Sequence, residues 1–130
     1  MDATVVDASV LVELSGERGE QIWSRLGDDW MHAPQVALIE TANALRRSAR
    51  TDRRAADAAG HWLAELPHLT RLSLHPHGPL LPRIWELRGQ FTAYDASYVA
   101  LAEWLQSPLL TLDRRLARAA ADLVEVIVPD

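Results

Sequence analysis

Cysteine is absent from this chain of 130 residues, and so is lysine. Without cysteine the chain has no disulfide, no thiol nucleophile and no thiolate metal site, so a bound metal ion would have only oxygen or imidazole ligands. No stretch approaches the roughly 20 apolar residues that a membrane-spanning helix needs. Asp2 stands where a signal peptide carries positive charge, so we expect no secretory segment and a cytoplasmic protein.

The lack of lysine leaves arginine as the only strongly basic residue. The 13 arginines stand against 18 acidic residues, and the net charge of -5 argues against a protein that holds nucleic acid by bulk attraction. Several arginines nevertheless cluster, within residues 46–54 and 114–118. Guanidinium groups match the geometry of phosphates, so Arg46, Arg114 and Arg115 are candidate contacts to a phosphodiester backbone. A solvated helix face is the alternative interpretation of both clusters.

Short apolar segments alternate with helical patterns along the whole chain. This alternation predicts βαβ units and a parallel α/β sheet in a single domain, residues 1–130. We expect strands near residues 3–7, 29–33, 69–74, 108–112 and 124–128. Helices are expected at 8–14, 18–27, 34–50, 52–66, 78–90, 94–106 and 113–121. Pro34 suits a first helical position, and Asp52 and Asp95 are expected to cap the helices that they precede.

Four acidic residues occupy positions that such a sheet would bring together. Asp7 follows the first strand, and Asp113 follows the strand expected at 108–112. Ligands of open α/β sheets bind at the carboxyl ends of the strands, so we expect both carboxylates in one crevice. Asp95 begins a segment similar to the one that begins at Asp7. Taken singly, each aspartate is also explained as a helix N-cap.

Glu40 is the fourth acid, and it lies inside the helix expected at 34–50. At 100° per residue, Glu40, Asn43 and Arg47 project from one side of this helix. The opposite side is the expected buried face, formed by Leu38, Ile39, Ala42 and Leu45. Glu40 is therefore expected to be exposed or to line a cleft, and an ordinary surface carboxylate is the alternative.

Carboxylates packed together need a compensating charge, because two unit charges ~5 Å apart repel by about 3 kcal/mol at an effective dielectric constant near 20. An all-oxygen acidic site favours Mg²⁺ or Mn²⁺ over zinc. Such a site suits hydrolysis of a phosphodiester bond. Ser9, Asn43 and Thr111 are candidates for orienting the ligands or waters around it, with capping or turn roles as the alternative.

At these residues the sequence resembles the PIN-domain ribonucleases, and specifically the VapC-type toxins of toxin–antitoxin pairs. The resemblance rests on four segments in order, which are 5–12 around Asp7, 40–46 from Glu40, 94–102 around Asp95 and 110–116 around Asp113. It implies a three-layer α/β/α sandwich with sheet order 3-2-1-4-5. It also implies that the four acids are the catalytic and metal-binding residues of an endoribonuclease dependent on Mg²⁺ or Mn²⁺.

The same resemblance implies three partners: an RNA substrate, a VapB-type antitoxin that inhibits the enzyme, and a second copy of the chain in a homodimer. No DNA or membrane partner is expected. One alternative is a PIN-like binding domain without catalysis. A phosphoryl receiver domain is a poorer alternative, because such domains resemble one another in a lysine that this chain lacks. A haloacid-dehalogenase-type phosphatase would need a second aspartate where Ser9 stands.

Five tryptophans are many for this length, and most lie at helical spacing beside leucines. This favours packing in the core or an interface over stacking on RNA bases. Trp23 with Ile22 and Leu26, and Trp62 with Leu63 and Leu66, are candidates for an apolar surface that receives an antitoxin helix. His75 and His77 flank a proline in a turn, and no metal role is expected for them, since no further ligand completes a set.

Overall fold

A five-stranded sheet forms the centre of the computed structural model, which describes residues 2–129. All four strand pairs are parallel, and the strand order is β3-β2-β1-β4-β5. The strands are β1 (Ala3–Val6), β2 (Trp30–Pro34), β3 (Leu72–His75), β4 (Leu109–Leu110) and β5 (Val126–Ile127). The predicted parallel sheet and its order are confirmed.

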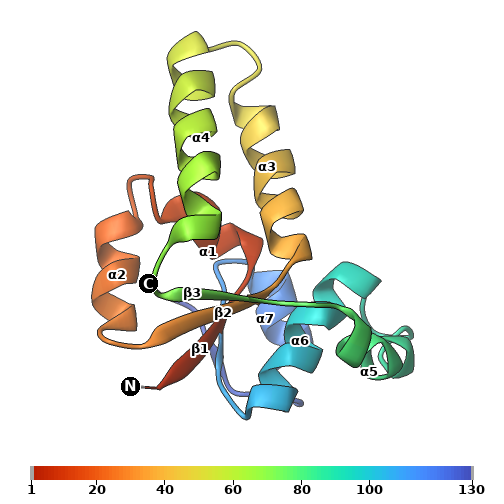
Figure 1. The fold of residues 1–130 in the computed structure, drawn as a ribbon. Helices are drawn as coiled ribbons and strands as arrows, with labels where there is room; N and C mark the ends of the chain where they lie inside the picture. Colours follow the sequence, from red (N-terminus) through yellow and green to blue (C-terminus); the bar gives the residue numbers. More distant parts are fainter. Residues whose placement is uncertain (1, 130) are drawn as a thin grey trace.

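Helices cover both faces of the sheet, as the predicted three-layer architecture requires (Figure 1). The α-helices are α1 (Ala8–Glu13), α2 (Gly19–Leu26), α3 (Val36–Ser48), α4 (Arg53–Glu65), α5 (Leu81–Glu86), α6 (Ala93–Leu105) and α7 (Arg114–Ala120). Two 3₁₀ helices, η1 (Leu66–His68) and η2 (Gly78–Leu80), complete the connections. Among residues 2–129 no helix combines the length and the apolar character needed to cross a membrane.

The core is built around β1 and α6. Val5 and Val6 of the central strand are fully buried, as expected for a parallel strand with helices on both of its faces. Seven consecutive residues of α6, 96–102, are each at most 3% exposed. A helix that is buried on all sides must be apolar or small all round, and this segment is rich in alanine, valine and leucine. Its burial fixes Asp95, one residue earlier, close to the strand ends.

Helices α3 and α4 pack against each other as a hairpin that stands out from the sheet (Figure 1). No residue of α4 is fully buried. The base of the hairpin is tied to the rest of the fold by Trp62, whose indole N–H donates to the carbonyl oxygen of Leu11 at 2.7 Å. The far end of the hairpin is the turn between Ser48 and Arg53; Arg50 lies in this turn, and the other clustered arginines of the hairpin lie in the helix ends beside it.

The predicted position of Pro34 is wrong. Pro34 ends β2, opposite His75 of β3, and α3 begins only at Val36. The missing N–H of the proline is tolerated, because the backbone N–H of Gln35 donates to the carbonyl oxygen of His75 at 3.0 Å instead. The predicted helix at 78–90 is also wrong as a single element. Its prolines restrict it to the short helices η2 and α5, followed by turns.

The predicted buried face of α3 is wrong at Ile39, while Leu38, Ala42 and Leu45 are partly buried. Ile39 is 70% exposed, while Thr41 is fully buried. The hydroxyl of Thr41 donates to the carbonyl oxygen of Ala37 at 2.7 Å, so its burial leaves no unpaired polar group. The buried residues of α3 are thus the small Ala37 and Thr41, and Leu38 packs against the core beside them.

Three of the six residues proposed for an apolar antitoxin surface belong to the core instead, and the other three are only partly exposed. Ile22, Leu26 and Leu66 are at most 3% exposed and belong to the core, and the neighbouring residues Trp23, Trp62 and Leu63 pack against it. Large exposed apolar side chains lie elsewhere, including Leu81 and Trp85 on α5 and Trp104 on α6. Helical spacing alone did not distinguish a face turned to the core from one turned to solvent.

Candidate active site at the strand ends

Asp7 is held from three directions at the end of β1. The residue is 5% exposed and caps α1. Its Oδ1 accepts hydrogen bonds from the hydroxyl of Ser9 at 2.6 Å and from the N–H of Val10 at 3.3 Å. Its Oδ2 accepts a hydrogen bond from the hydroxyl of Thr111 at 2.6 Å. The orientation of this carboxylate is therefore set by the fold itself.

Burial raises the pKa of Asp7 from its ordinary value of 3.8 to about 6, because removal from water disfavours the charged form. The hydrogen bonds from Ser9, Thr111 and Val10 oppose this shift, and the charge of Asp113 adds to it. Both effects that raise the pKa would be offset by a cation at this carboxylate. A buried acid with a perturbed pKa at the strand ends is a candidate for a functional group.

Ser9 and Thr111 join the ends of β1 and β4. While its hydroxyl donates to Asp7, Ser9 Oγ accepts the N–H of Leu112 at 2.9 Å. Thr111 Oγ1 likewise accepts the N–H of Asp113 at 3.0 Å while donating to Asp7. Each hydroxyl thus connects the carboxylate to the backbone that follows β4. Both residues act on the position of Asp7 rather than as isolated turn residues.

Asp113 and Asp95 lie on either side of a guanidinium group. Asp113 caps α7, and its Oδ1 accepts the N–H groups of Arg115 at 3.0 Å and Leu116 at 3.2 Å. The side chain of Arg115 places Nη2 3.0 Å from Oδ2 of Asp95 and 3.4 Å from Oδ2 of Asp113. Arg115, predicted as a phosphate contact, therefore bridges two of the acids, and its side chain is 67% exposed.

Asp95 does not cap α6, contrary to the prediction from sequence. Thr92 is the N-cap, and its hydroxyl oxygen accepts the N–H of Asp95 at 3.2 Å. Asp95 is thus the third residue of the helix, where a negative charge is favourable near the helix N-terminus. Because the cap is supplied by Thr92, the carboxylate of Asp95 is available for contacts across the site.

Glu40 reaches the same region from α3, and a buried tyrosine holds it there. The hydroxyl of Tyr98, a residue 1% exposed on α6, donates to Oε1 of Glu40 at 2.5 Å. Partial burial raises the pKa of Glu40; the hydrogen bond from Tyr98 opposes this shift, and the charge of Asp95 adds to it. The pKa of Tyr98 is raised strongly, first by burial and then by its contact with Glu40, so the phenol stays a donor.

The four acids are linked as neighbours rather than gathered around one point. Asp7 interacts electrostatically with Asp113, and Glu40 with Asp95. Arg115 joins Asp95 to Asp113. Within residues 2–129 no three acidic or histidine side chains are close enough to hold a metal ion by themselves. The donor set fits Mg²⁺ or Mn²⁺ bound by one or two carboxylates with waters and substrate oxygens, which is the usual pattern for Mg²⁺.

The other predicted site residues lie at the edge of this region. Asn43 and Arg46 are exposed on α3, beyond Glu40, and Arg114 is exposed in the first turn of α7. Thr92 and Tyr98 were not predicted to take part. Tyr98 lies three residues after Asp95, one turn along the same helix face, and this spacing is the signal that could have identified it.

Three histidines lie close together at the end of β3. His32 Nδ1 is 2.8 Å from His75 Nε2, and burial lowers the pKa of both imidazoles. Nε2 of His77 accepts the N–H of Val36 at 2.9 Å, so His77 caps the start of α3. The backbone contact occupies Nε2 of His77, and the short contact pairs the rings of His32 and His75; that these histidines have no metal role stays a prediction.

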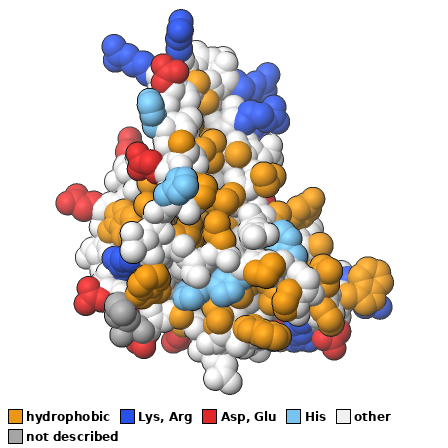
Figure 2. Space-filling view, viewed as in Figure 1, with side chains coloured by type: hydrophobic (Ala, Val, Ile, Leu, Met, Phe, Trp, Pro, Cys, Tyr) orange, Lys and Arg blue, Asp and Glu red, His pale blue; other side chains and the backbone are white. Residues whose placement is uncertain are grey.

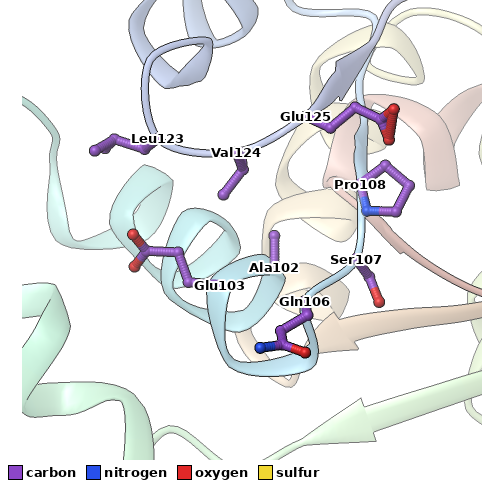
Figure 3. Close-up of a pocket in the computed structure, with 8 residues that line it drawn as sticks. All are labelled: Ala102, Glu103, Gln106, Ser107, Pro108, Leu123, Val124 and Glu125. Carbon is purple, nitrogen blue, oxygen red and sulfur yellow. The ribbon is translucent and has the colours of Figure 1, made fainter.

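A pocket of about 360 Å³ opens beside the amino-terminal ends of β4 and β5 (Figure 3), whereas Asp7 and Asp113 follow the carboxyl ends of β1 and β4. Its lining comes from the end of α6 and the segments that precede β4 and β5, with Glu103 and Glu125 among its polar residues. Glu103 already forms a two-point ion pair with Arg83, at 2.8 and 3.0 Å. None of the four acids lines this pocket, so we do not assign the candidate active site to it.

Comparison with known proteins gives a consistent result for family and fold. Residues 4–122 match the model of the PIN domain family. The chain is 42% identical over 123 residues to Ribonuclease VapC1 of Mycobacterium tuberculosis, covering 92% of each protein. It is 35% identical over 127 residues to Ribonuclease VapC3 of Pyrobaculum aerophilum, covering 95% of each.

Solved structures agree with these relatives. The crystal structure of PAE2754 from Pyrobaculum aerophilum superposes with a TM-score of 0.72 at 26% identity, covering 95% of this chain and 83% of that one. VapC20 of Mycobacterium tuberculosis, described as a toxin that cleaves the sarcin-ricin loop, superposes with a TM-score of 0.69 at 21% identity, covering 95% and 98%. At that identity the second likeness concerns the fold alone.

Proposed function

Because this chain belongs to the PIN-domain family and is a VapC-type member of it, we propose that it is an endoribonuclease toxin whose activity requires Mg²⁺ or Mn²⁺. The reaction is hydrolysis of RNA phosphodiester bonds, at the site formed by Asp7, Glu40, Asp95 and Asp113. Relatives named ribonucleases over most of the chain's length support the nuclease activity. The metal requirement rests on the chemistry of the donor set.

The arrangement around Asp7 is the observation that carries the proposal. A fold without a use for this acid would not be expected to bury a carboxylate, raise its pKa to about 6 and surround it with three donors. The cost of burying it is offset when a cation binds. The charge of Asp113 acts on Asp7 and that of Asp95 on Glu40, which supports the proposal that each pair contributes carboxylates to a bound ion.

Each side chain has a distinct part in the proposed reaction. Ser9 and Thr111 keep both oxygens of Asp7 in fixed directions, and Tyr98 does the same for Glu40. When bound, a divalent ion supplies positive charge beside the phosphate oxygens and activates water. The exposed guanidinium of Arg115 neutralises Asp95 and Asp113 in this structure, and it is free to turn toward a phosphate that approaches the acids.

The test is incubation of the purified protein with total RNA in Mg²⁺ or Mn²⁺, then with EDTA, followed by mapping of new 5′ ends. We expect discrete cuts that EDTA abolishes and that Asp7→Asn removes. The matched control is Asp28→Asn, which makes the same chemical change at an exposed position outside the site and should leave the cuts intact. Identical cuts with and without the chelator, or full activity in Asp7→Asn, would overturn the proposal.

The proposed toxin also has protein partners. The resemblance to VapC-type toxins supports inhibition by a VapB-type antitoxin and assembly of the toxin as a homodimer. The exposed apolar side chains Leu81, Trp85 and Trp104 are suited to a protein interface, because they would be removed from water there. Sedimentation analysis of the purified chain should show a dimer that Trp85→Glu converts to a monomer; a monomer at all concentrations would contradict this part.

A further inference from the structure

The far end of the α3–α4 hairpin carries a cluster of five arginines, which we call the arginine tip: Arg46, Arg47, Arg50, Arg53 and Arg54. All five side chains are exposed, and none forms an ion pair within residues 2–129. Blue side chains accordingly gather at the end of the hairpin in the space-filling view (Figure 2). These guanidinium groups are free to bind a partner.

Charge is distributed very unevenly between the tip and the rest of the chain. Residues 46–54 hold five of the 13 basic residues and one of the 18 acidic residues, a net charge of +4. The remaining residues hold eight basic and 17 acidic residues, a net charge of -9, which together with the tip gives the total of -5. A polyanion is therefore attracted to this end of the molecule, while the net negative charge of the remaining residues repels it.

Helix stability does not account for the whole tip. Arg46 and Arg47 lie in the last turn of α3, where positive charge is favourable. Arg53 and Arg54 lie in the first turn of α4, where the same charge is unfavourable. Five like charges within nine residues also repel one another. Bound anions would relieve both the repulsion and the unfavourable placement.

The tip is continuous with the candidate active site along one face of α3. Asn43 and Arg47 follow Glu40 at three and seven residues, so all three lie on the same side of the helix. At 1.5 Å per residue, Arg47 lies roughly 10 Å along the helix axis from Glu40. A nucleic-acid strand covers that distance in about two to three nucleotides, given a phosphate spacing of at least 3.4 Å.

We propose that the arginine tip binds the RNA backbone a few nucleotides from the cut, so that the substrate is held at two points. This inference rests on the proposed function, and it adds that the substrate must be long enough to reach the tip. Phosphate is favoured over a protein partner because residues 46–54 include no aromatic or large aliphatic side chain that could form the apolar centre of a protein interface. Guanidinium forks, in contrast, match phosphate oxygens closely.

The experiment compares two RNAs that share one cut sequence, a tetranucleotide and a strand extended by ten nucleotides on each side. The variant is Arg50→Gln/Arg53→Gln. The matched control is Arg25→Gln/Arg88→Gln, which removes the same charge at exposed positions on α2 and after α5.

For the long RNA we expect the tip variant to raise KM about tenfold at low salt. Its slope of log KM against log salt should fall by about 1.4, from two lost contacts to a single strand. The value of kcat and all parameters for the tetranucleotide should stay unchanged.

An unchanged KM for the long RNA, or an equal loss in the control variant, would overturn the proposal. Fluorescence anisotropy with the long RNA in EDTA separates this failure from failure of the proposed function, because it measures binding without chemistry. Weaker binding by the tip variant than by the control supports the tip even if no RNA is cut. A polyglutamate peptide of equal charge is the protein probe, and binding as tight as that of RNA would also overturn the proposal.

Discussion

Tyr98 shows how a residue away from the chemistry controls an acid at the site. Its hydroxyl is the one donor that the structure gives to the carboxylate of Glu40 among the described residues. The ring is buried in α6, so the donor cannot move far. We regard Tyr98 as a positioning residue, because it acts through Glu40 and touches neither the proposed ion nor RNA.

The variant Tyr98→Phe should therefore weaken the apparent affinity for Mn²⁺ by about tenfold, as loss of a group that orients a metal ligand generally does. It should also lower the free energy of unfolding by about 1–2 kcal/mol, since a charged acceptor loses its donor. The Mn²⁺ dependence of RNA cleavage measures the first effect and urea unfolding the second. Saturating Mn²⁺ should restore kcat.

The control for that experiment is Tyr94→Phe, which removes the same atom from an exposed tyrosine of the same helix. It should leave the Mn²⁺ dependence as in the wild type. If Tyr98→Phe loses stability but keeps its Mn²⁺ dependence, Tyr98 is a packing residue and has no positioning role.

Asp7 should make stability depend on pH. Its pKa is about 6 in the folded state against an ordinary value of 3.8, so the folded state binds the proton more tightly than the unfolded state. The carboxyl group therefore stabilises the fold below about pH 4, and this contribution is lost as the pH rises through 6. The lost contribution is about 2–3 kcal/mol, given 1.36 kcal/mol per unit of pKa.

Asp7→Asn removes this titration. Relative to the wild type, its free energy of unfolding in EDTA should rise by about 2–3 kcal/mol between pH 4 and pH 7.5. Urea unfolding at both values measures the difference, with Asp28→Asn as the control for net charge. A difference that does not change with pH would show that the carboxyl group of Asp7 is not destabilised by burial.

Sequence patterns predicted the local position of some of these residues but missed the contacts or the local role of others. Asp7 and Asp113 were predicted from strand ends, because the position of a strand end fixes the residue that follows it. The contact between Glu40 and Tyr98 was not predicted, because it joins residues 58 apart and depends on how α3 and α6 lie in the fold. Asp95 was assigned to the wrong local role, because Thr92 is an equally good cap three residues earlier.

At the scale of elements, the pair of hydroxyls between β1 and β4 is the main link that holds the site together. Ser9 and Thr111 bind the same carboxylate and also the backbone after β4. The two strands pair directly through Val5 with Leu109 and Val6 with Leu110. The strand ladder sets their spacing, and the hydroxyls set the direction of Asp7.

Removing either hydroxyl should cost about 1–3 kcal/mol of unfolding free energy, because a buried carboxylate and a backbone N–H both lose a partner. The variants are Ser9→Ala and Thr111→Val. The loss of unfolding free energy in the double variant should differ from the sum of the losses in the two single variants by at least about 0.5 kcal/mol. A coupling of this size is typical of residues in one hydrogen-bond network. Urea unfolding of the four proteins gives this coupling, and Ser48→Ala, exposed on α3, is the control. Strict additivity would show that the two hydroxyls act independently.

The elements themselves were predictable to different degrees. The parallel sheet was predicted from the alternation of apolar strands with helices, and its strand order from the family resemblance alone. The region 78–90 was predicted as one helix, but prolines and turns divide it. The face of α3 was misjudged, because Ile39 looks like a core residue in sequence while only the tertiary structure shows that it is exposed.

At the scale of the whole molecule, the fold places the acidic candidate site and the arginine tip in separate regions. The parallel sheet brings together acids that are up to 106 positions apart, at the end where β1 and β4 finish. The hairpin of α3 and α4 carries the opposite charge away from them. An acidic protein can in this way bind RNA at a few points, one through the proposed cation at the acids and one through the arginine tip.

The four acids, acting as two pairs, are proposed to bind the divalent ions needed for catalysis. The most direct test of this central claim is a titration of the protein with Mn²⁺ in the absence of RNA, followed by electron paramagnetic resonance of the free ion. Wild type and Asp28→Asn should bind Mn²⁺ equally. Asp7→Asn, Asp95→Asn and Asp113→Asn should each bind it about tenfold more weakly or worse, and Glu40→Gln should also weaken binding. Equal binding by wild type and all four site variants would contradict the account.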